Sequence, residues 1–343
     1  LEFRFLESAA DPPVSGLGPV LSADYDDPHA LERLAAHVDV VTYEFENVPV
    51  EAARALEAWV PVHPTPSALE MAQDRLTEKT EFRRLGIQTA PFRPVDSLDQ
   101  LRAALSELGM PAVLKTRRFG YDGKGQAVIR QESDVAPAWD TLGGVPLILE
   151  GFVDFERELS VVGVRGMDGE FRCYPLSENH HENGILRVTR APAPGLTPQL
   201  QAEGEAILRS VMESMGYVGV LAIELFQVGD HFRANEMAPR VHNSGHWTQD
   251  GASVSQFENH LRAVVGLPLG PTDEVRPSVM VNLLGDLPNL TEVLELPGAH
   301  LHLYGKAPRP GRKLGHVNIV TESAEASMAT ARRLLSMLPP PMG

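Results

Sequence analysis

Residues 222–247 read AIELFQVGDHFRANEMAPRVHNSGHW, in which two apolar runs flank a Gly-Asp turn. This pattern predicts a β-hairpin that places Glu224 and Glu236 opposite each other. Directly opposed side chains lie about 5 Å apart at Cβ, and like charges there destabilise the strand pair. A divalent cation would offset the repulsion, because Mg²⁺ is bound by one or two carboxylates together with phosphate oxygens. With Asn235 beside Glu236, the hairpin indicates such a site; the alternative is two glutamates on a solvated face.

The composition excludes several classes of function. The chain has 343 residues with 46 acidic and 30 basic side chains, a net charge of −16. A non-specific nucleic-acid binder needs the opposite balance, because phosphate neutralisation dominates its affinity. The same charge argues against an anionic membrane surface, and no stretch approaches the roughly 20 apolar residues of a membrane span. The single cysteine, Cys173, can form no intramolecular disulfide, which is typical of a reducing cytoplasm.

The order of sequence patterns predicts a mixed α/β and α+β chain with three regions. In residues 1–70, an apolar run at 38–45 between two helical patterns predicts a βαβ layer with a parallel sheet. Residues 71–270 form the large central region, and the run GLPLGP separates it from a small C-terminal region, 271–343. The predicted elements include helices at 29–37, 50–59, 97–108, 198–214 and 323–336, strands at 111–117, 126–130, 146–150, 157–166 and 277–285, and the hairpin at 218–237.

A glycine-rich turn follows the strand pattern that contains Lys115. In LKTRRFGYDGKGQAV, residues 114–128, glycines would let backbone N–H groups approach a phosphate, whose charge Lys115 could neutralise. The run is not a Walker A loop, because neither Gly-Lys-Ser/Thr nor a helix follows. An ordinary Asp-Gly hairpin turn is the alternative. Next, LILEGFVDFERELSVVGV, residues 147–164, would either cradle a flat aromatic ring at its hinge or simply form two sheet strands.

Two polar loops complete the candidate site. PRVHNSGHWTQDGAS, residues 239–253, concentrates hydrogen-bonding side chains, and loops carry binding residues more often than their share. His242 and His246 are four residues apart, but the glycine between them argues against a helical zinc pair. The run favours binding of an anionic or polar substrate; the alternative is a loop that only connects elements. The run YGKAPRPGRKLGHVN indicates either an anion clamp or a solvated basic loop. Its basic side chains are Lys306, Arg309, Arg312 and Lys313.

Together these stretches resemble the ATP-grasp superfamily and, within it, the 5-(carboxyamino)imidazole ribonucleotide synthetase family. The resemblance rests on YEFENVP, QDRLTEK, LKTRRFGYDGKGQ, ELSVVGVRG, HHENGILR, NEMAPRVHNSGHWTQDGASVSQFENHLRA and RPGRKLGHVN. It implies an ATP-grasp fold in which two α+β lobes clamp ATP. A Rossmann-like pre-ATP-grasp domain would precede this fold and a small C-terminal domain would follow it.

The implied activity is that of an ATP-dependent carbon–nitrogen ligase in de novo purine biosynthesis. Bicarbonate would be activated as carboxyphosphate and transferred to the exocyclic amine of 5-aminoimidazole ribonucleotide, with ADP and phosphate as the other products. ATP and Mg²⁺ are the implied cofactors, and a homodimer is the implied assembly.

The resemblance also implies roles for individual residues. Mg²⁺ is expected on Glu224 and Glu236. The expected ATP-binding residues are Arg75, Lys115, Gly120, Tyr121, Asp122, Gly123, Lys124, Gly125, Gln126, Glu150, Gly151, Phe152, Val153, Glu158, His181, Asn235 and Glu236. The expected ribonucleotide-binding residues are Glu44, His242, Ser244, His246, Lys306, Arg312 and Lys313, and the expected catalytic residues are Arg240, His242, Asn243, Tyr121 and Lys306.

The chain departs from the family pattern at its start. The family opens with a strand and a glycine-rich GGGQLG-type turn, whereas this chain opens with LEFRFLES, so we expect a truncated first domain with an incomplete ribonucleotide site. Two other functions stay open. One is a related ATP-grasp enzyme such as a formate-dependent glycinamide ribonucleotide transformylase, which the RVHNSGHWTQ and RPGRK runs fit less well. The other is a catalytically dead nucleotide-binding module.

Overall fold

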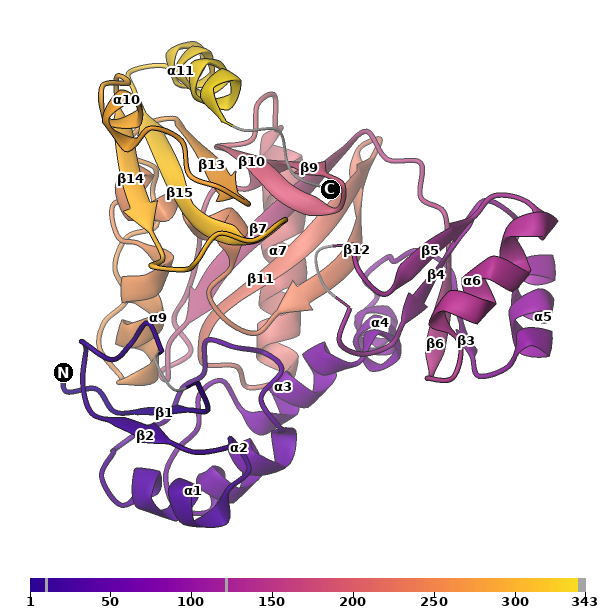
Figure 1. Ribbon diagram of the computed structural model, residues 1–343, viewed down its shortest axis with the longest axis horizontal. Helices are drawn as coiled ribbons and strands as arrows, with labels where there is room; N and C mark the ends of the chain where they lie inside the picture. Colours follow the sequence, from indigo (N-terminus) through magenta and orange to yellow (C-terminus); the bar gives the residue numbers. More distant parts are fainter. Residues whose placement is uncertain (10–11, 121–122, 339–343) are drawn as a thin grey trace.

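Within the described residues, 1–9, 12–120 and 123–338, a nine-stranded antiparallel sheet forms the centre of the computed structural model (Figure 1). The strand order is β12-β11-β7-β9-β10-β13-β15-β14, with β8 paired to β7. The strands are β7 (Arg157–Arg165), β8 (Phe171–Cys173), β9 (Ser177–Glu182), β10 (Ile185–Ala191), β11 (Gly219–Val228), β12 (His231–Ala238), β13 (Ser278–Leu284), β14 (Ala299–Leu303) and β15 (Lys313–Val320).

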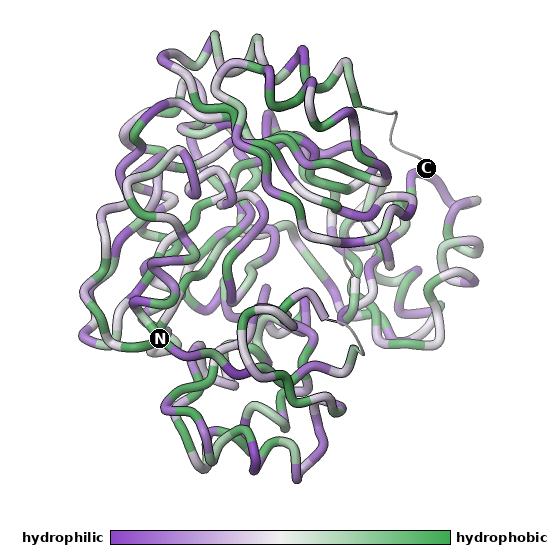
Figure 2. The backbone as a smooth tube through the Cα atoms, turned by 60° about the vertical axis from the view of Figure 1, so that its left-hand side comes forward, coloured by the Kyte–Doolittle hydropathy of each residue, from purple (hydrophilic) through white to green (hydrophobic). Residues whose placement is uncertain are grey.

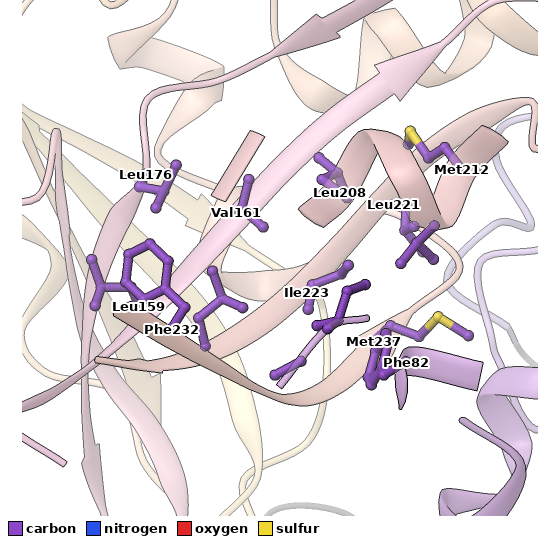
Figure 3. Packing of buried hydrophobic residues seen from close by; sticks show 14 of the residues in the cluster. Phe82, Leu159, Val161, Leu176, Leu208, Met212, Leu221, Ile223, Phe232 and Met237 are labelled. Carbon is purple, nitrogen blue, oxygen red and sulfur yellow. The ribbon is translucent and has the colours of Figure 1, made fainter. Parts of the chain in front are cut away.

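Helices cover both faces of this sheet, because its strands carry apolar side chains on either side. Alternate residues of β11 belong to different buried clusters, Leu221 and Ile223 to one and Val220 and Ala222 to the other, and Figure 2 shows hydrophobic residues along much of the backbone. On one face, α7 (Pro198–Ser214) packs its buried Leu200, Leu208 and Val211 against β7 and β11; part of this cluster appears in Figure 3. The other helices around this sheet are α8 (Thr248–Gly251), α9 (Gln256–Val264), α10 (Leu290–Leu294), α11 (Ala324–Met337) and the 3₁₀ turn η2 (Asn243–Gly245).

A smaller lobe projects to one side of the large sheet (Figure 1). Its four antiparallel strands lie in the order β3-β6-β4-β5 around a core of their own. The helix α4 (Arg75–Arg84) leads into this lobe, and Asp74 caps it by accepting from the amides of Leu76 and Thr77. The lobe consists of β3 (Phe92–Val95), α5 (Leu98–Leu108), β4 (Ala112–Thr116), β5 (Gln126–Ile129), η1 (Glu132–Asp134), α6 (Val135–Leu142) and β6 (Leu147–Gly151).

The N-terminal region contains parallel pairing, as predicted, but less of it. Strands β1 (Phe5–Glu7) and β2 (Val20–Ser22) pair in parallel, and the helices are α1 (Pro28–Ala35), α2 (Val50–Glu57) and α3 (Pro66–Gln73). The prediction of a strand over 38–45 is wrong: only Val41 forms an isolated parallel bridge, to Val62. A strand needs a partner along its length, and the rest of this run instead lines the central cleft.

Beyond the boundary expected near residues 266–271, the strands continue the sheet of the central region. Strand β13 pairs with β10, with Val281 opposite Val188, so the C-terminal strands extend the sheet of the central region. Ile319 of β15 and Leu334 of α11 share a buried cluster with Val188. The predicted helix at 198–214 and the hairpin at 218–237 are confirmed. Among the described residues, no helix combines the length and apolar character needed to cross a membrane.

Candidate functional site

A β-bulge places the two glutamates of the hairpin together. Ile223 pairs with Met237, but Leu225 pairs with Ala234, so β12 has one more residue than β11 between these pairs. The extra residue allows both Asn235 and Glu236 to lie across from Glu224. Neighbouring residues Ile223 and Leu225 point into a buried cluster on the other face of the sheet. Glu224 and Glu236 therefore face the cleft, whose wall they form together.

The two carboxyl groups differ in protonation. Burial, reinforced by the charge of Glu236, raises the pKa of Glu224 to about 7. Burial acts in the same direction on Glu236, but the charge and hydrogen bond of Arg75 outweigh it and lower its pKa to about 2. Although 40% of the Glu236 side chain is accessible, that area faces the cleft. One carboxylate is ionised and the other titrates near neutrality, so a cation between them would stabilise both in the charged form.

These residues fit a divalent cation that also contacts phosphate. Two carboxylates converge on one wall, and Asn235 Oδ1 is buried without a hydrogen-bond partner among the described atoms. Oxygen ligands of this kind suit Mg²⁺. No cluster of three or more His, Cys, Asp or Glu side chains in the described part of the chain would hold a metal by itself. The arrangement therefore suits an ion that takes its remaining ligands from a substrate.

The glycine-rich turn lies between the two lobes. Arg75 Nη2 donates to the carbonyl of Gly120 at 3.2 Å. A Cβ on Gly125, whose φ is +71°, would lie 2.7 Å from Thr116 Oγ1, so the position requires glycine. A Cβ on Gly123 would lie 3.2 Å from the carbonyl oxygen of Asn183, in the turn between β9 and β10. The turn thus approaches the opposite lobe. Predicted residues Tyr121 and Asp122 lie outside the described residues.

Lys115 and Glu150 form an ion pair in the smaller lobe. Lys115 Nζ donates to Glu150 Oε2 at 2.9 Å, and Glu150 is 3% exposed. Burial raises the pKa of Glu150, but Lys115 and Lys79 more than reverse the effect, so the pKa is lowered overall. Lys115 also lies opposite Gln126, the first residue of β5. Charge compensation therefore keeps Glu150 ionised beside the hinge between the two lobes.

The rest of the expected nucleotide site spans that hinge. Gly151 ends β6, and after it Phe152 is 46% exposed whereas Val153 is buried. Across the hinge, His181 Nδ1 lies 2.8 Å from Glu158 Oε2. Burial by itself would lower the pKa of His181, but this contact with Glu158 raises it overall.

The polar loop after β12 brings its side chains to the cleft in an ordered arrangement. Arg240 Nη2 lies 2.9 Å from Glu46 Oε2. His242 Nδ1 accepts from the amide of Ser244 and lies 2.8 Å from its hydroxyl, so its Nε2 carries the proton and lies 3.7 Å from Glu224 Oε1. Burial, followed by the charge of Arg240, lowers the pKa of His242 to about 3. The imidazole is therefore neutral at pH 7.

Other predicted residues of this loop have structural partners. Asn243 and Asn282 exchange reciprocal amide hydrogen bonds of 3.0 and 2.7 Å. Ser244 is fully buried and bonds to His242, so its side chain supports the loop from behind. His246 lines the cleft beside the rings of Phe257 and His316. The loop therefore contributes some side chains to the cleft and uses others to hold its shape.

The basic loop and the N-terminal region form the far wall of the same cleft, which has a volume of about 2510 Å³. Lys306 and Lys313 line it together with Glu44. Burial raises the pKa of Glu44, and Arg240 and Lys306 oppose this rise. Arg312 lies outside the lining; its Nη1 donates to the carbonyl of Ala307 at 3.3 Å. Arg309 is exposed.

Several residues at the site were missed by sequence reasoning. Tyr304 lines the cleft with its hydroxyl 2.7 Å from His316 Nδ1, and Lys306 Nζ lies 5.3 Å from the centre of its ring. Glu78 and Lys79 of α4 are each 1% exposed. The sequence did contain a signal for these two residues. Glu78 and Lys79 precede Phe82 by four and three residues, so on a helix all three lie on the same face. Polar residues on a core-facing stripe were the signal.

The chain matches three families in succession: a ribonucleotide synthetase preATP-grasp domain over residues 1–73, an ATP-grasp domain over 80–257 and a phosphoribosylaminoimidazole carboxylase C-terminal domain over 278–330. It is 50% identical to an N5-carboxyaminoimidazole ribonucleotide synthase of Pseudomonas aeruginosa over 93% of this chain and 88% of that protein. For the Escherichia coli protein of the same name, the identity is 43% over 88% and 84%.

Solved structures agree with these matches. The structure resembles N5-carboxyaminoimidazole ribonucleotide synthetase from Thermus thermophilus with a TM-score of 0.95 and 52% identity, over 99% of this chain and 93% of that chain. It also resembles N5-carboxyaminoimidazole synthase from Aspergillus clavatus, in complex with ADP and 5-aminoimidazole ribonucleotide, with a TM-score of 0.90 and 28% identity, over 97% and 90%.

Proposed function

The chain belongs to the N5-carboxyaminoimidazole ribonucleotide synthases, ATP-grasp enzymes of purine biosynthesis, and we propose that its cleft carries out their reaction with the residues described above. The enzyme converts 5-aminoimidazole ribonucleotide, bicarbonate and ATP into N5-carboxyaminoimidazole ribonucleotide. The observation that carries the assignment of residues is that one cleft contains the carboxylate pair, the Arg240–His242 loop and the lysines of the basic loop.

The nucleotide phosphates would lie between the two lobes. Lys115, Arg75 and the backbone of the glycine-rich turn would neutralise and cradle them, while Glu150 to Val153 and Glu158 would hold the adenosine. Mg²⁺ held by Glu224 and Glu236, with Asn235 beside them, would supply charge stabilisation to the transferring phosphoryl group. Arg75 already spans the site, because one guanidinium contacts both Glu236 and Gly120.

Activation of bicarbonate would occur beside the carboxylate pair. A bicarbonate oxygen attacks the γ-phosphorus of ATP, ADP leaves, and carboxyphosphate forms. Arg240 would balance its negative charge, and the neutral His242 would donate a hydrogen bond through Nε2. Carboxyphosphate decomposes in water, so closure of the glycine-rich turn against the opposite lobe would exclude solvent from it.

Transfer to the amine would follow at the far wall. The exocyclic amine of the ribonucleotide forms a bond to the carboxyl carbon, loses a proton, and phosphate leaves. Glu44, in the N-terminal region, would bind the amine. Lys306 and Lys313 would hold the ribonucleotide phosphate. Departing phosphate or a nearby carboxylate would accept the proton.

Phosphate release from ATP tests this proposal. We expect release that requires Mg²⁺ and bicarbonate and that 5-aminoimidazole ribonucleotide stimulates. Formate with glycinamide ribonucleotide, the substrates of the related transformylase, should give no stimulation. Phosphate release that 5-aminoimidazole ribonucleotide leaves unchanged would reject the proposal. No phosphate release, either with bicarbonate and 5-aminoimidazole ribonucleotide or with formate and glycinamide ribonucleotide, would favour the inactive nucleotide-binding module.

A further inference from the structure

Two consecutive buried ionisable side chains on α4 contact the neighbours of one residue of the carboxylate pair. Glu78 Oε1 accepts a hydrogen bond from the amide of Met237 at 2.5 Å. Lys79 Nζ donates to the carbonyl of Asn235 at 2.8 Å. These backbone groups belong to the residues immediately before and after Glu236. The carboxylate of Glu236 itself is bound by Arg75, one helical turn earlier, at 2.5 Å. One helix therefore contacts Glu236 at its side chain and at both of its neighbours.

The position of β12 explains why these backbone groups need partners from outside the sheet. β12 is the last strand in the order, and among the described residues its outer edge pairs only through an isolated bridge from Ala234 to Thr89. The bulge next to Leu225 interrupts the ladder on its inner edge as well. Buried backbone N–H and C=O groups without partners are costly, and α4 supplies partners for the carbonyl of Asn235 and the amide of Met237. Phe82 of α4 and Met237 of β12 also belong to the same buried apolar cluster (Figure 3).

Neutral side chains would satisfy these backbone groups at a lower cost. Burial raises the pKa of Glu78 to about 8 and lowers that of Lys79, because desolvation disfavours the charged form of both side chains. Lys79 makes one further contact, 3.3 Å from Glu150 Oε1. Glu150 in turn binds Lys115. The Lys79 ammonium therefore joins the strand of the expected adenine site to the strand of the expected metal site.

We propose that Glu78 and Lys79 are positioning residues, which fix the backbone from Asn235 to Met237 so that Glu236 presents its carboxylate to the metal and the nucleotide phosphates. Lys79 couples this position to Glu150 in the other lobe. The inference rests on the proposed function insofar as Glu236 holds the metal. A purely structural pair would stabilise the fold without changing how nucleotide binding depends on Mg²⁺.

Calorimetric titration of the whole protein with ADP, at a series of MgCl₂ concentrations, separates the two roles. Mg²⁺ should tighten ADP binding, and we measure the Mg²⁺ concentration at which half of this tightening is reached. In Lys79→Met we expect that concentration to rise about tenfold or more, which is the range for loss of a residue that orients a metal ligand. Lys79→Arg should recover part of the change. Arg84→Met is the matched control, because Arg84 lies on the same helix but pairs with Glu81 at the surface.

A folded Lys79→Met protein with the Mg²⁺ dependence of the wild type would overturn the proposal, as would a loss of ADP binding that is equal with and without Mg²⁺. If Lys79→Met fails to fold, two variants of Glu78 test the proposal instead. Glu78→Gln keeps an accepting oxygen for the Met237 amide and should behave nearly as wild type, whereas Glu78→Leu should shift the Mg²⁺ dependence. Equal behaviour of these two variants would reject the role. Because ADP binding needs neither bicarbonate nor ribonucleotide, the result is independent of the carboxylation assay.

Discussion

The Arg75 guanidinium lies 2.5 Å from the Glu236 carboxylate, joining residues that are 161 positions apart in the chain. Arg75 thereby occupies the side of Glu236 on which a metal-bound triphosphate is expected. Nucleotide binding would transfer part of this ion pair to the phosphates, because both the arginine and the metal ion favour anionic oxygen partners. The contact makes Glu236 the residue on which the electrostatics of the site depend.

Glu236→Gln should lower kcat by at least about 100-fold, since loss of a metal ligand should cost no less than loss of a residue that orients one. The amide oxygen can still accept from Arg75, so the thermal unfolding midpoint should change little. Steady-state kinetics at varied MgCl₂ and a thermal melt measure the two quantities. A rate and Mg²⁺ dependence equal to those of the wild type would refute the assignment of Glu236 as a ligand.

Arg312→Ala should raise the KM for 5-aminoimidazole ribonucleotide and leave the KM for ATP unchanged. The structure predicts a smaller effect than that of Lys306→Met, because Lys306 lines the cleft while Arg312 holds the loop through the carbonyl of Ala307. Initial rates with each substrate varied in turn measure both constants. Equal increases in the two KM values would show that the basic loop does not act specifically on the ribonucleotide.

His260 should make the stability of the protein fall with acidification. Its Nδ1 accepts from the amide of Val220 at 3.1 Å, and Nε2 lies 2.8 Å from Thr42 Oγ1, so the folded ring is neutral. Burial lowers its pKa to about 4. In the unfolded chain histidine titrates near pH 6.5, so the unfolded state takes up the proton first as the pH falls.

The stability contributed by neutral His260 is complete above about pH 6.5, is lost at up to about 1.4 kcal/mol per pH unit, and levels off below about pH 4. Urea unfolding between pH 7 and pH 4.5 should show a shallower pH dependence for His260→Gln than for the wild type. Identical slopes for the two proteins would mean that His260 binds its proton equally in both states.

Asn282→Leu should destabilise the fold by about 1–3 kcal/mol, because it removes both amide hydrogen bonds of Asn243 and the donor to the carbonyl of Leu186. Exposed Asn289→Leu is a comparison of the same chemical change at a helix cap. Urea unfolding at pH 7 gives both free energies. A loss below about 0.5 kcal/mol for Asn282→Leu, as for ordinary surface positions, would show that the amide pair is dispensable.

Local patterns predicted much of the secondary structure. Helix α7 and the β11–β12 hairpin follow from apolar periodicity and turn residues, which act over a few neighbouring positions. The run at 38–45 shows the limit of that reasoning. It has the composition of a strand, but pairing depends on what lies beside it in space, and there Val41 meets only Val62.

The candidate site divides in the same way. Sequence indicated that Glu224 and Glu236 face each other, because register across a short turn is a local property. It could not show that Ser244 is buried behind His242, that Arg312 lies outside the cleft, or that the sheet continues from β10 into β13.

The sequence by itself determined the hairpin, the glycine-rich turn and the kinds of side chain available for phosphate and metal. Only the tertiary structure decided which buried polar groups meet: Arg75 with Glu236, Lys79 with Glu150, and Glu78 with the amide of Met237. The physical reason is that propensity and periodicity act between near neighbours in the chain. The partners of these buried groups instead depend on how α4 packs against the edge of the large sheet, whose strand β12 lies more than a hundred residues later in the chain.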